Sequence, residues 1–298
     1  EDLPRPFLAR NAETGNLEPV YVEYAFKPNA KAVRVPCPRF PVGSAKTQVL
    51  EEILIAGLKS GLFVEVSEST GALRPMLVGK YDADADRAGI PTAIRMCGDF
   101  PPLNDQVEKV CAMAPHIEDE VSKMRGYKYY FSLDASGQYH SFLLSKRSQE
   151  ASTIWFPRAG RQVKAQYTRM TMGAKNSGAT AQTAFNKMFA DDLRPEYANR
   201  VANAADDICG GADTIDELLD ILEEVFRVLC LHNVQLKPSK LHVGQNFVDF
   251  WGKRYSGKGV SMSPRNISPA LRMRPATNLH ELRSLLGYLN QWGAWLGP

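Results

Sequence analysis

Two adjacent carboxylates inside an apolar segment constrain the fold of this chain more than any other feature of its sequence. Residues 200–213 read RVANAADDICGGAD, so Asp206 and Asp207 lie between small apolar residues and a pair of glycines. This pattern predicts two short strands with the acids near the turn that joins them. Neighbouring carboxylates in an apolar setting are costly unless something neutralises their charge, and a divalent cation does so.

A third acid follows an apolar run about seventy positions earlier. Residues 129–133 read YYFSL and are followed by Asp134, which predicts a buried strand with a carboxylate at its C-terminal end. Mg²⁺ prefers oxygen ligands, and two ions roughly 3.5–4 Å apart need carboxylates from separate strands. Two metal ions held in this way catalyse in-line phosphoryl transfer. From spacing alone, an ordinary polar turn and a strand-end acid explain these residues equally well.

The remaining elements mix helices and strands without a regular βαβ rhythm, which indicates an α+β fold. The first forty residues lack periodicity and predict an extended arm. The capping box of Thr214 and Glu217 predicts a helix over 214–231. The other expected elements are a helix at 45–61, strands at 63–66 and 76–78, a strand at 247–252 that turns at Gly252, a polar hairpin loop at 82–89, and a last helix that begins near Asn278 with Glu281 as its capping partner.

Composition excludes several classes of protein. Apolar residues make up 44% of the 298 residues, enough for a packed core, which argues against wholesale disorder. No apolar run approaches the roughly 20 residues of a membrane span, and the first residues resemble no secretory signal. The five cysteines form no C-x-x-C pair, so a disulfide framework is not expected and a reducing, intracellular location is. Because no apolar run is long enough to span a membrane, no membrane partner is expected. Cys230, His232 and His242 do not have a known zinc-site spacing, so we expect core or surface roles for them.

The net charge of +3 hides an ordered pattern. Residues 145–187 carry eight basic side chains and one acidic side chain, and residues 237–298 carry nine and two. Between them, residues 188–236 carry three basic and eleven acidic side chains. Two basic blocks therefore flank one acidic block, an order of charges that the net charge alone does not reveal.

Eight segments occur in a fixed order that is specific when taken together. They are Gln48–Leu62, Met76–Lys80, Arg95–Asn104, Phe131–Tyr139, Met172–Gln182, Ala204–Asp207, Leu236–Gly252 and Asn278–Asn290. In this order and at these distances they resemble the polymerase region of reverse transcriptases, most closely those of Ty3/gypsy-like retroelements and their retroviral relatives. The resemblance covers the chain from about residue 40 to its end.

The resemblance implies a role for each matched residue. Asp134 and Asp206 would hold two Mg²⁺ ions, which Mn²⁺ could replace, and Asp207 would assist as a third carboxylate. Lys240 would protonate the leaving pyrophosphate as a general acid. The substrate-binding set comprises Lys80 and Arg95 over the incoming triphosphate, Tyr139 as the gate against a ribose 2′-hydroxyl, Met172 and Gln182 near the nucleotide, and Phe250, Trp251 and Gly252 as the primer grip.

Ordinary structural roles remain open for several of these residues. Tyr139 and Trp251 could serve as packing residues, the commoner role of an aromatic ring beside a strand. Lys80 and Lys240 could be solvated surface lysines.

Four positions depart from the pattern of the family. Ala204 stands where the Y-x-D-D box has tyrosine, and Pro101 stands where arginine is usual. Met172 replaces Phe or Gln beside the nucleotide, and Gly178 replaces the usual proline. These differences bear on fidelity, nucleotide affinity and rate, whereas the three acids are retained.

The resemblance implies a right-hand polymerase fold, with an antiparallel palm sheet backed by helices. The expected parts are an N-terminal arm at 1–40, fingers at 41–109 and 142–176, palm at 110–141 and 177–256, and thumb at 257–298. The implied activity is RNA-directed DNA synthesis, with dNTPs and a primer annealed to RNA or DNA as partners. Because the chain ends with the thumb, no ribonuclease H activity is expected of it.

Two other functions compete with this one. A nucleic-acid-binding relative that has lost catalysis is favoured by Ala204 and Met172 and opposed by the three intact acids. An RNA-dependent RNA polymerase shares paired acids, but the aromatic gate at Tyr139 argues against it. Whether the chain acts as a monomer or a homodimer is not determined by the sequence.

Overall fold

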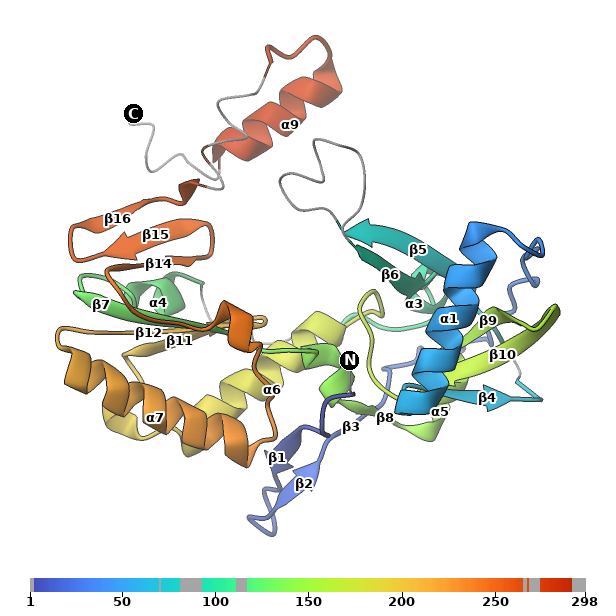
Figure 1. Cartoon of the computed structure of the whole chain (residues 1–298), viewed down its shortest axis with the longest axis horizontal. Coiled ribbons are helices and arrows are strands. Elements are labelled where there is room, and N and C mark those ends of the chain that lie inside the picture. The colour runs from blue at the N-terminus through green and yellow to red at the C-terminus, as the bar shows by residue number, and fades with distance from the viewer. Residues whose placement is uncertain are drawn as a thin grey trace.

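The sheet expected as the palm is four-stranded and antiparallel (Figure 1). The computed structural model describes residues 3–69, 71–80, 93–110, 117–264, 267 and 274–290. The sheet has the order β11 (Val201–Ala204), β12 (Asp207–Ala212), β7 (Tyr129–Asp134) and β13 (His242–Gln245). Both predictions from the acidic segments are confirmed, because Asp134 ends one strand and Asp206–Asp207 lie at a hairpin turn.

Both faces of the palm sheet are buried. Successive residues of β7 point to opposite faces and therefore enter two different clusters. Phe131 and Leu133 pack into the large core with α6 (Ser177–Asp192) and α7 (Ile215–Leu231). Tyr130 packs into a second cluster on the other face, with residues of α4 (Ile117–Ser122) and β14 (Phe247–Phe250). This alternation puts Asp134 on the face of the smaller cluster.

The helix that was predicted after Thr214 is present as α7. The Thr214 side chain accepts a hydrogen bond from the Glu217 amide at 3.2 Å, and the Glu217 carboxylate accepts one from Asp213, one residue before the expected capping-box partner. Six apolar residues on one face of α7 are buried against β7 and β12, namely Leu218, Ile221, Leu222, Val225, Val228 and Leu229. The helix thus covers one face of the palm sheet and leaves an acidic face to solvent.

The part of the chain expected to form the fingers lies to the right of the palm sheet in Figure 1. It contains α1 (Ala45–Ser60), a sheet of β4 (Phe63–Val66), β10 (Arg161–Tyr167) and β9 (Thr153–Arg158), and the antiparallel pair β5 (Pro75–Lys80) and β6 (Ala93–Gly98). Short helices α3 (Pro101–Asn104) and α5 (Lys146–Ala151) complete this part. The predicted hairpin loop at 82–89 lies outside the described residues.

The N-terminal arm is less isolated than its sequence suggested. It forms the hairpin β1 (Leu8–Arg10) and β2 (Leu17–Pro19), and β3 (Tyr21–Val22) pairs in parallel with β8 (Leu143–Leu144). Phe7 is 1% exposed and packs against Phe142 and Phe185, with ring centroids 4.9 and 5.7 Å away. The sequence lacks periodicity here because single aromatic residues, not a periodic face, anchor the arm.

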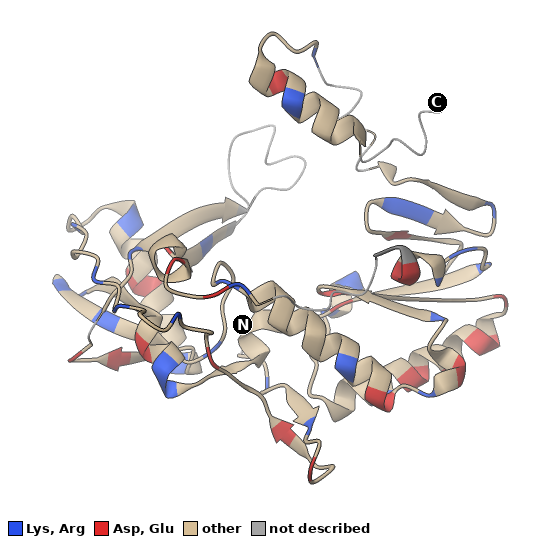
Figure 2. Cartoon of the chain, turned by 180° about the vertical axis from the view of Figure 1, so that it is seen from behind, with Lys and Arg blue, Asp and Glu red and all other residues tan. Residues whose placement is uncertain are grey.

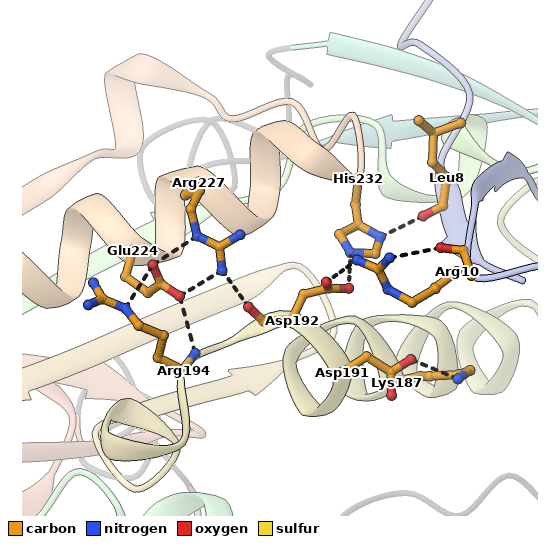
Figure 3. A network of polar contacts seen from close by, with 10 residues as sticks. Leu8, Arg10, Lys187, Asp191, Asp192, Arg194, Glu224, Arg227 and His232 are labelled. Atoms are coloured by element: carbon orange, nitrogen blue, oxygen red, sulfur yellow. Dashed lines mark hydrogen bonds and ion pairs between the residues drawn. The ribbon is translucent and has the colours of Figure 1, made fainter. Parts of the chain in front are cut away.

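A polar network behind the palm also holds the arm (Figure 3). The His232 ring is 1% exposed; its Nδ1 lies 2.6 Å from the Leu8 carbonyl oxygen and its Nε2 lies 3.0 Å from an Asp192 oxygen. Arg10 pairs with the same Asp192 carboxylate. Burial opposes ionisation of Asp192, but hydrogen bonds from Arg10 and His232 outweigh it and lower the pKa of Asp192. The arm, α6 and α7 are therefore joined at one point.

The C-terminal part begins with a small sheet beside the palm. It consists of β14, β15 (Lys253–Ser256) and β16 (Gly259–Met262), and a helix, α9 (Leu279–Asn290), follows it farther from the palm (Figure 1). The Asn278 side chain accepts a hydrogen bond from the Glu281 amide at 2.9 Å, as the sequence predicts. The short turns η1 (Gln138–Ser141), η2 (Pro195–Tyr197) and η3 (Pro238–Lys240) connect the palm elements. Among the described helices, none is long and apolar enough to cross a bilayer.

The fold makes a direct prediction for Gly210, in β12. A Cβ at this position would lie 2.3 Å from ring atoms of the buried Phe131. We expect Gly210→Ala to lower the free energy of unfolding by about 1–3 kcal/mol, because an overpacked core must shift to accept the methyl group. Urea denaturation measures this, with Gly287→Ala as control, since a Cβ at Gly287 meets nothing within 4 Å. Equal urea midpoints for the two variants would contradict the packing described here.

Candidate active site

The three acids meet at one end of the palm sheet. Asp134 and Asp207 are partners in the antiparallel ladder between β7 and β12. Asp206 lies in the two-residue loop before β12, and its carbonyl oxygen accepts a hydrogen bond from the Ala135 amide at 2.8 Å. Residues about seventy positions apart in the sequence are thereby placed side by side.

Asp134 is held differently from the two other acids. Asp134 is only 9% exposed, whereas Asp206 and Asp207 are exposed to solvent. The Lys240 ammonium forms an ion pair with Asp134 Oδ2. The Lys237 amide donates to the Asp134 carbonyl oxygen at 3.0 Å and so brings the turn that ends at Lys240 next to this acid. A lysine thus compensates the charge of the most buried acid.

The carboxylates are suited to a divalent cation by their chemistry. All three donors are oxygens, as hard cations prefer, and they come from two paired strands and the loop before one of them. Within the described part of the chain, no three acidic, histidine or cysteine side chains converge on one point as a complete metal cluster. The ion pair with Lys240 occupies one oxygen of Asp134. Mg²⁺ or Mn²⁺ at these residues therefore stays a prediction.

Tyr139 lies beside the acids in the turn η1. Partial burial raises the pKa of the Tyr139 hydroxyl, and the nearby Asp206 carboxylate raises it further. A Cβ at Gly178, in the first turn of α6, would lie 3.7 Å from the Tyr139 hydroxyl oxygen. The ring is thus placed between the acidic loop and the start of α6, close to where the resemblance puts an incoming nucleotide.

Gln182 contacts the acidic loop. Its Oε1 accepts a hydrogen bond from the Ala205 amide at 2.7 Å, and its Nε2 donates to Asn186 and Asn203, each at 2.7 Å. Gln138, which the sequence did not single out, donates from Nε2 to the Ala205 carbonyl oxygen at 2.7 Å. Only the place of Gln138 directly before Tyr139, inside a recognised motif, offered a signal for it.

The predicted triphosphate contacts belong to the fingers. Arg95 is exposed on β6 and pairs with Val78 in the ladder. Lys80 ends β5 opposite Ala93, and its side chain lies outside the described part of the structure. Met172 is 49% exposed in the segment between β10 and α6. These three residues stand on other elements than the acids, so the site is assembled from separate parts of the chain.

The predicted primer grip divides into a buried and an exposed residue. Phe250 is 1% exposed and packs with Val248 and Tyr255 in the smaller cluster. Trp251 is 51% exposed, and it forms with Gly252 a two-residue hairpin loop with φ values of 50° and 72°. Of the two aromatic residues, Trp251 presents its ring to solvent, while Phe250 supports the strand from inside.

Charge is distributed over the molecule as the sequence pattern indicates. Figure 2 marks acidic residues along α7 and basic residues in the fingers and in the β14–β16 sheet. The acidic block at 188–236 therefore includes the solvated face of α7 as well as the acidic loop.

The palm sheet, the carboxylates at its end and the surrounding fingers define a right-hand polymerase fold. Residues 86–255, more than half of the chain, match the family model described as "Reverse transcriptase (RNA-dependent DNA polymerase)". This chain belongs to the reverse transcriptase family.

Similar proteins support this assignment. The chain is 25% identical over 290 residues to the Transposon Tf2-3 and Tf2-4 polyproteins of Schizosaccharomyces pombe; the match covers 97% of this chain and 20% of each relative. The chain thus spans about a fifth of the length of these curated relatives. A foamy viral protease-reverse transcriptase dRH in complex with ds DNA has a similar structure, with a TM-score of 0.76 and 19% identity over 96% of this chain and 45% of that one.

Another solved structure agrees in fold. The foamy viral protease-reverse transcriptase in complex with an RNA/DNA hybrid gives a TM-score of 0.71 at 20% identity, over 96% of this chain and 35% of that chain. The predicted α+β right-hand architecture is confirmed by these likenesses. The exact boundaries of arm, fingers, palm and thumb stay predictions.

Proposed function

We propose that this chain is an RNA-directed DNA polymerase that extends a primer on an RNA or DNA template with dNTPs. The observation that carries the proposal is the pairing of Asp134 with Asp207 across adjacent palm strands, with Asp206 in the loop beside them. Carboxylates from separate strands are what nucleotidyl transfer with two metal ions requires. Membership of the reverse transcriptase family supports the same activity.

Each residue of the site would have a separate role in the reaction. Asp134, Asp206 and Asp207 would hold two Mg²⁺ ions, which when bound activate the primer 3′-hydroxyl and stabilise the leaving pyrophosphate. Lys240 would be released from Asp134 and hold a proton near the leaving group. Arg95 would bind phosphate oxygens of the nucleotide from the fingers. Trp251 would support the primer end with its exposed ring.

Nucleic acid is the partner that the comparisons favour. The structural neighbours were solved in complex with dsDNA or with an RNA/DNA hybrid. The basic residues of the fingers and of the β14–β16 sheet, which are blue in Figure 2, would contact the phosphate backbones of such a duplex. These neighbours share 19–21% identity with this chain, so the duplex partner of this chain is part of the proposal.

Tyr139 gives a prediction about the choice of sugar. If its ring excludes a ribose 2′-hydroxyl, Tyr139→Val should reduce the preference for dGTP over GTP by about 10²-fold, because the substitution opens the space of the ring. Tyr139→Phe keeps the ring and should keep the preference. Single-nucleotide incorporation kinetics with dGTP and GTP measure both variants. An unchanged ratio in Tyr139→Val would remove Tyr139 from sugar selection.

A catalytically impaired nucleic-acid-binding relative is the second candidate. Ala204 favours it, because this residue is 8% exposed on the same strand end and offers only a methyl group where the family has a tyrosine ring. Primer extension on an RNA template with Mg²⁺ separates the two, with dNTPs compared with NTPs and Asp206→Asn as control. Incorporation of dNTPs that Asp206→Asn abolishes supports the polymerase; no incorporation, or equal incorporation by the variant, supports the impaired relative.

A further inference from the structure

The loop that carries the acids contains a residue in an unfavourable backbone conformation. Ala205, between β11 and β12, has a φ of 52°. Residues other than glycine rarely adopt positive φ, and glycine is favoured at such positions of two-residue hairpin loops. A residue in this conformation persists only where its surroundings hold it. Because Asp206 and Asp207 follow directly, whatever holds Ala205 also places these two carboxylates.

Two glutamine side chains hold the backbone of Ala205 from different elements. Gln182, in α6, accepts from the Ala205 amide at 2.7 Å, and Gln138, in η1, donates to the Ala205 carbonyl oxygen at 2.7 Å. Ala205 lies outside the ladder, which pairs Ala204 with Asp207. Its N–H and C=O therefore need partners elsewhere, and the two amides supply both.

Each glutamine is itself fixed. The Gln182 amide nitrogen donates to Asn186 and Asn203. Gln138 is 6% exposed, and its main-chain carbonyl oxygen accepts a hydrogen bond from the Ser141 hydroxyl at 2.6 Å, which holds the turn from which the side chain extends. Hydrogen bonds preorganise the Gln182 side chain and burial restricts the Gln138 side chain, so little conformational entropy is lost when the two bind the loop.

We propose that Gln138 and Gln182 form an amide clamp on Ala205 that sets the position of Asp206 and Asp207 against Asp134. This proposal rests on the proposed polymerase function of the three acids. Gln138 is the distinctive part, since it acts as a positioning residue and touches no reacting group. The clamp also explains how the turn is fixed although Ala205 and the preceding Ala204 offer only methyl groups for packing.

The clamp has a kinetic signature that a general loss of stability does not have. A displaced Asp206 should weaken metal binding and slow the chemical step, whereas nucleotide contacts from the fingers are unaffected. We expect Gln138→Met, which keeps the length of the side chain but donates no hydrogen bond, to lower kcat by about 10–100-fold. The KM for dNTP should change less than about twofold, and the Mg²⁺ concentration for half-maximal rate should rise several-fold.

Two measurements do not depend on catalysis. Hydrogen exchange followed by mass spectrometry should show faster exchange in the peptide that contains residues 203–208 of Gln138→Met, with unchanged exchange in the rest of the palm. Titration with Mn²⁺ followed by electron paramagnetic resonance should show weaker binding than in the unchanged chain. Gln48→Met, an exposed position of α1, is the matched control.

The outcomes are distinguishable. The clamp is wrong if Gln138→Met keeps the kcat and the Mg²⁺ dependence of Gln48→Met, or if residues 203–208 exchange at the same rate in both. A raised KM for dNTP in the corresponding Gln182→Met variant would assign Gln182 to substrate contact instead. If the unchanged chain extends no primer, the proposed function fails, and the clamp is then decided by hydrogen exchange and Mn²⁺ binding alone.

Discussion

Asp134→Asn is expected to lower the rate of primer extension by at least about 10³-fold without unfolding the chain. Asparagine has nearly the same size as aspartate, so the packing at the end of β7 is kept. The substitution removes the negative charge opposite Asp207 that a divalent cation needs. It also leaves the Lys240 ammonium without its present partner. Steady-state extension of a labelled primer on an RNA template measures the loss.

Two further variants separate the causes of this effect. Asp220→Asn makes the same chemical change on the exposed face of α7 and should leave the rate unaltered. Lys240→Met removes the ion pair from the other side and should cost about 10²-fold, the contribution of a general acid. If Asp134→Asn and Lys240→Met reduced the rate equally, the ion pair and not a metal site would explain the role of Asp134.

Local signals in the sequence predicted α1, α7 and α9, whereas α6 at Ser177–Asp192 was not predicted. Gly61 ends α1 with a φ of 81°, and Thr214 caps α7, because caps depend on residues within one turn of the helix. The buried strand that ends at Asp134 was likewise visible as a short apolar run. Such features need no knowledge of the rest of the fold.

Features that depend on distant contacts were not predictable in this way. The hydrogen bond from Gln138 joins two residues that are 67 positions apart, and no local pattern connects them. Phe7 packs against three rings from distant parts of the sequence, Phe142, Phe185 and His232, so the sequence of its segment predicted only an extended arm. The burial of Phe250 was available from the alternation along β14, where Val248 and Phe250 point inward. The primer-grip motif nevertheless predicted the same role for Phe250, Trp251 and Gly252.

The second large effect is expected at the back of the palm, where Glu224 is buried between two arginines (Figure 3). Arg227 donates to Glu224 from Nε at 2.9 Å and from Nη2 at 2.7 Å, and Arg194 Nε lies 3.2 Å from the same carboxylate. The hydrogen bonds from Arg227 outweigh the effect of burial and lower the pKa of Glu224 to about 2. The carboxylate therefore stabilises the fold as an anion.

The pH dependence follows from the direction of this shift. A carboxylate whose pKa is lower in the folded chain stabilises it fully above the unfolded value, and this contribution disappears as the pH falls towards the folded value. For Glu224 the window runs from about 4.5 down to about 2. Both arginine side chains are about half exposed, at 53% and 49%, so solvent screens part of the interaction.

We expect Glu224→Gln to lower the free energy of unfolding at pH 7 by about 2 kcal/mol, because two guanidinium groups lose their shared anion. Glu223→Gln, on the exposed side of the same turn of α7, should change it by less than about 0.5 kcal/mol. Urea denaturation from pH 7 to pH 3 tests both. The difference between Glu224→Gln and the unchanged chain should narrow as the pH falls below about 4.5, since a protonated glutamic acid and a glutamine are both neutral. A difference that stays constant over this range would show that Glu224 acts through packing and not through its charge.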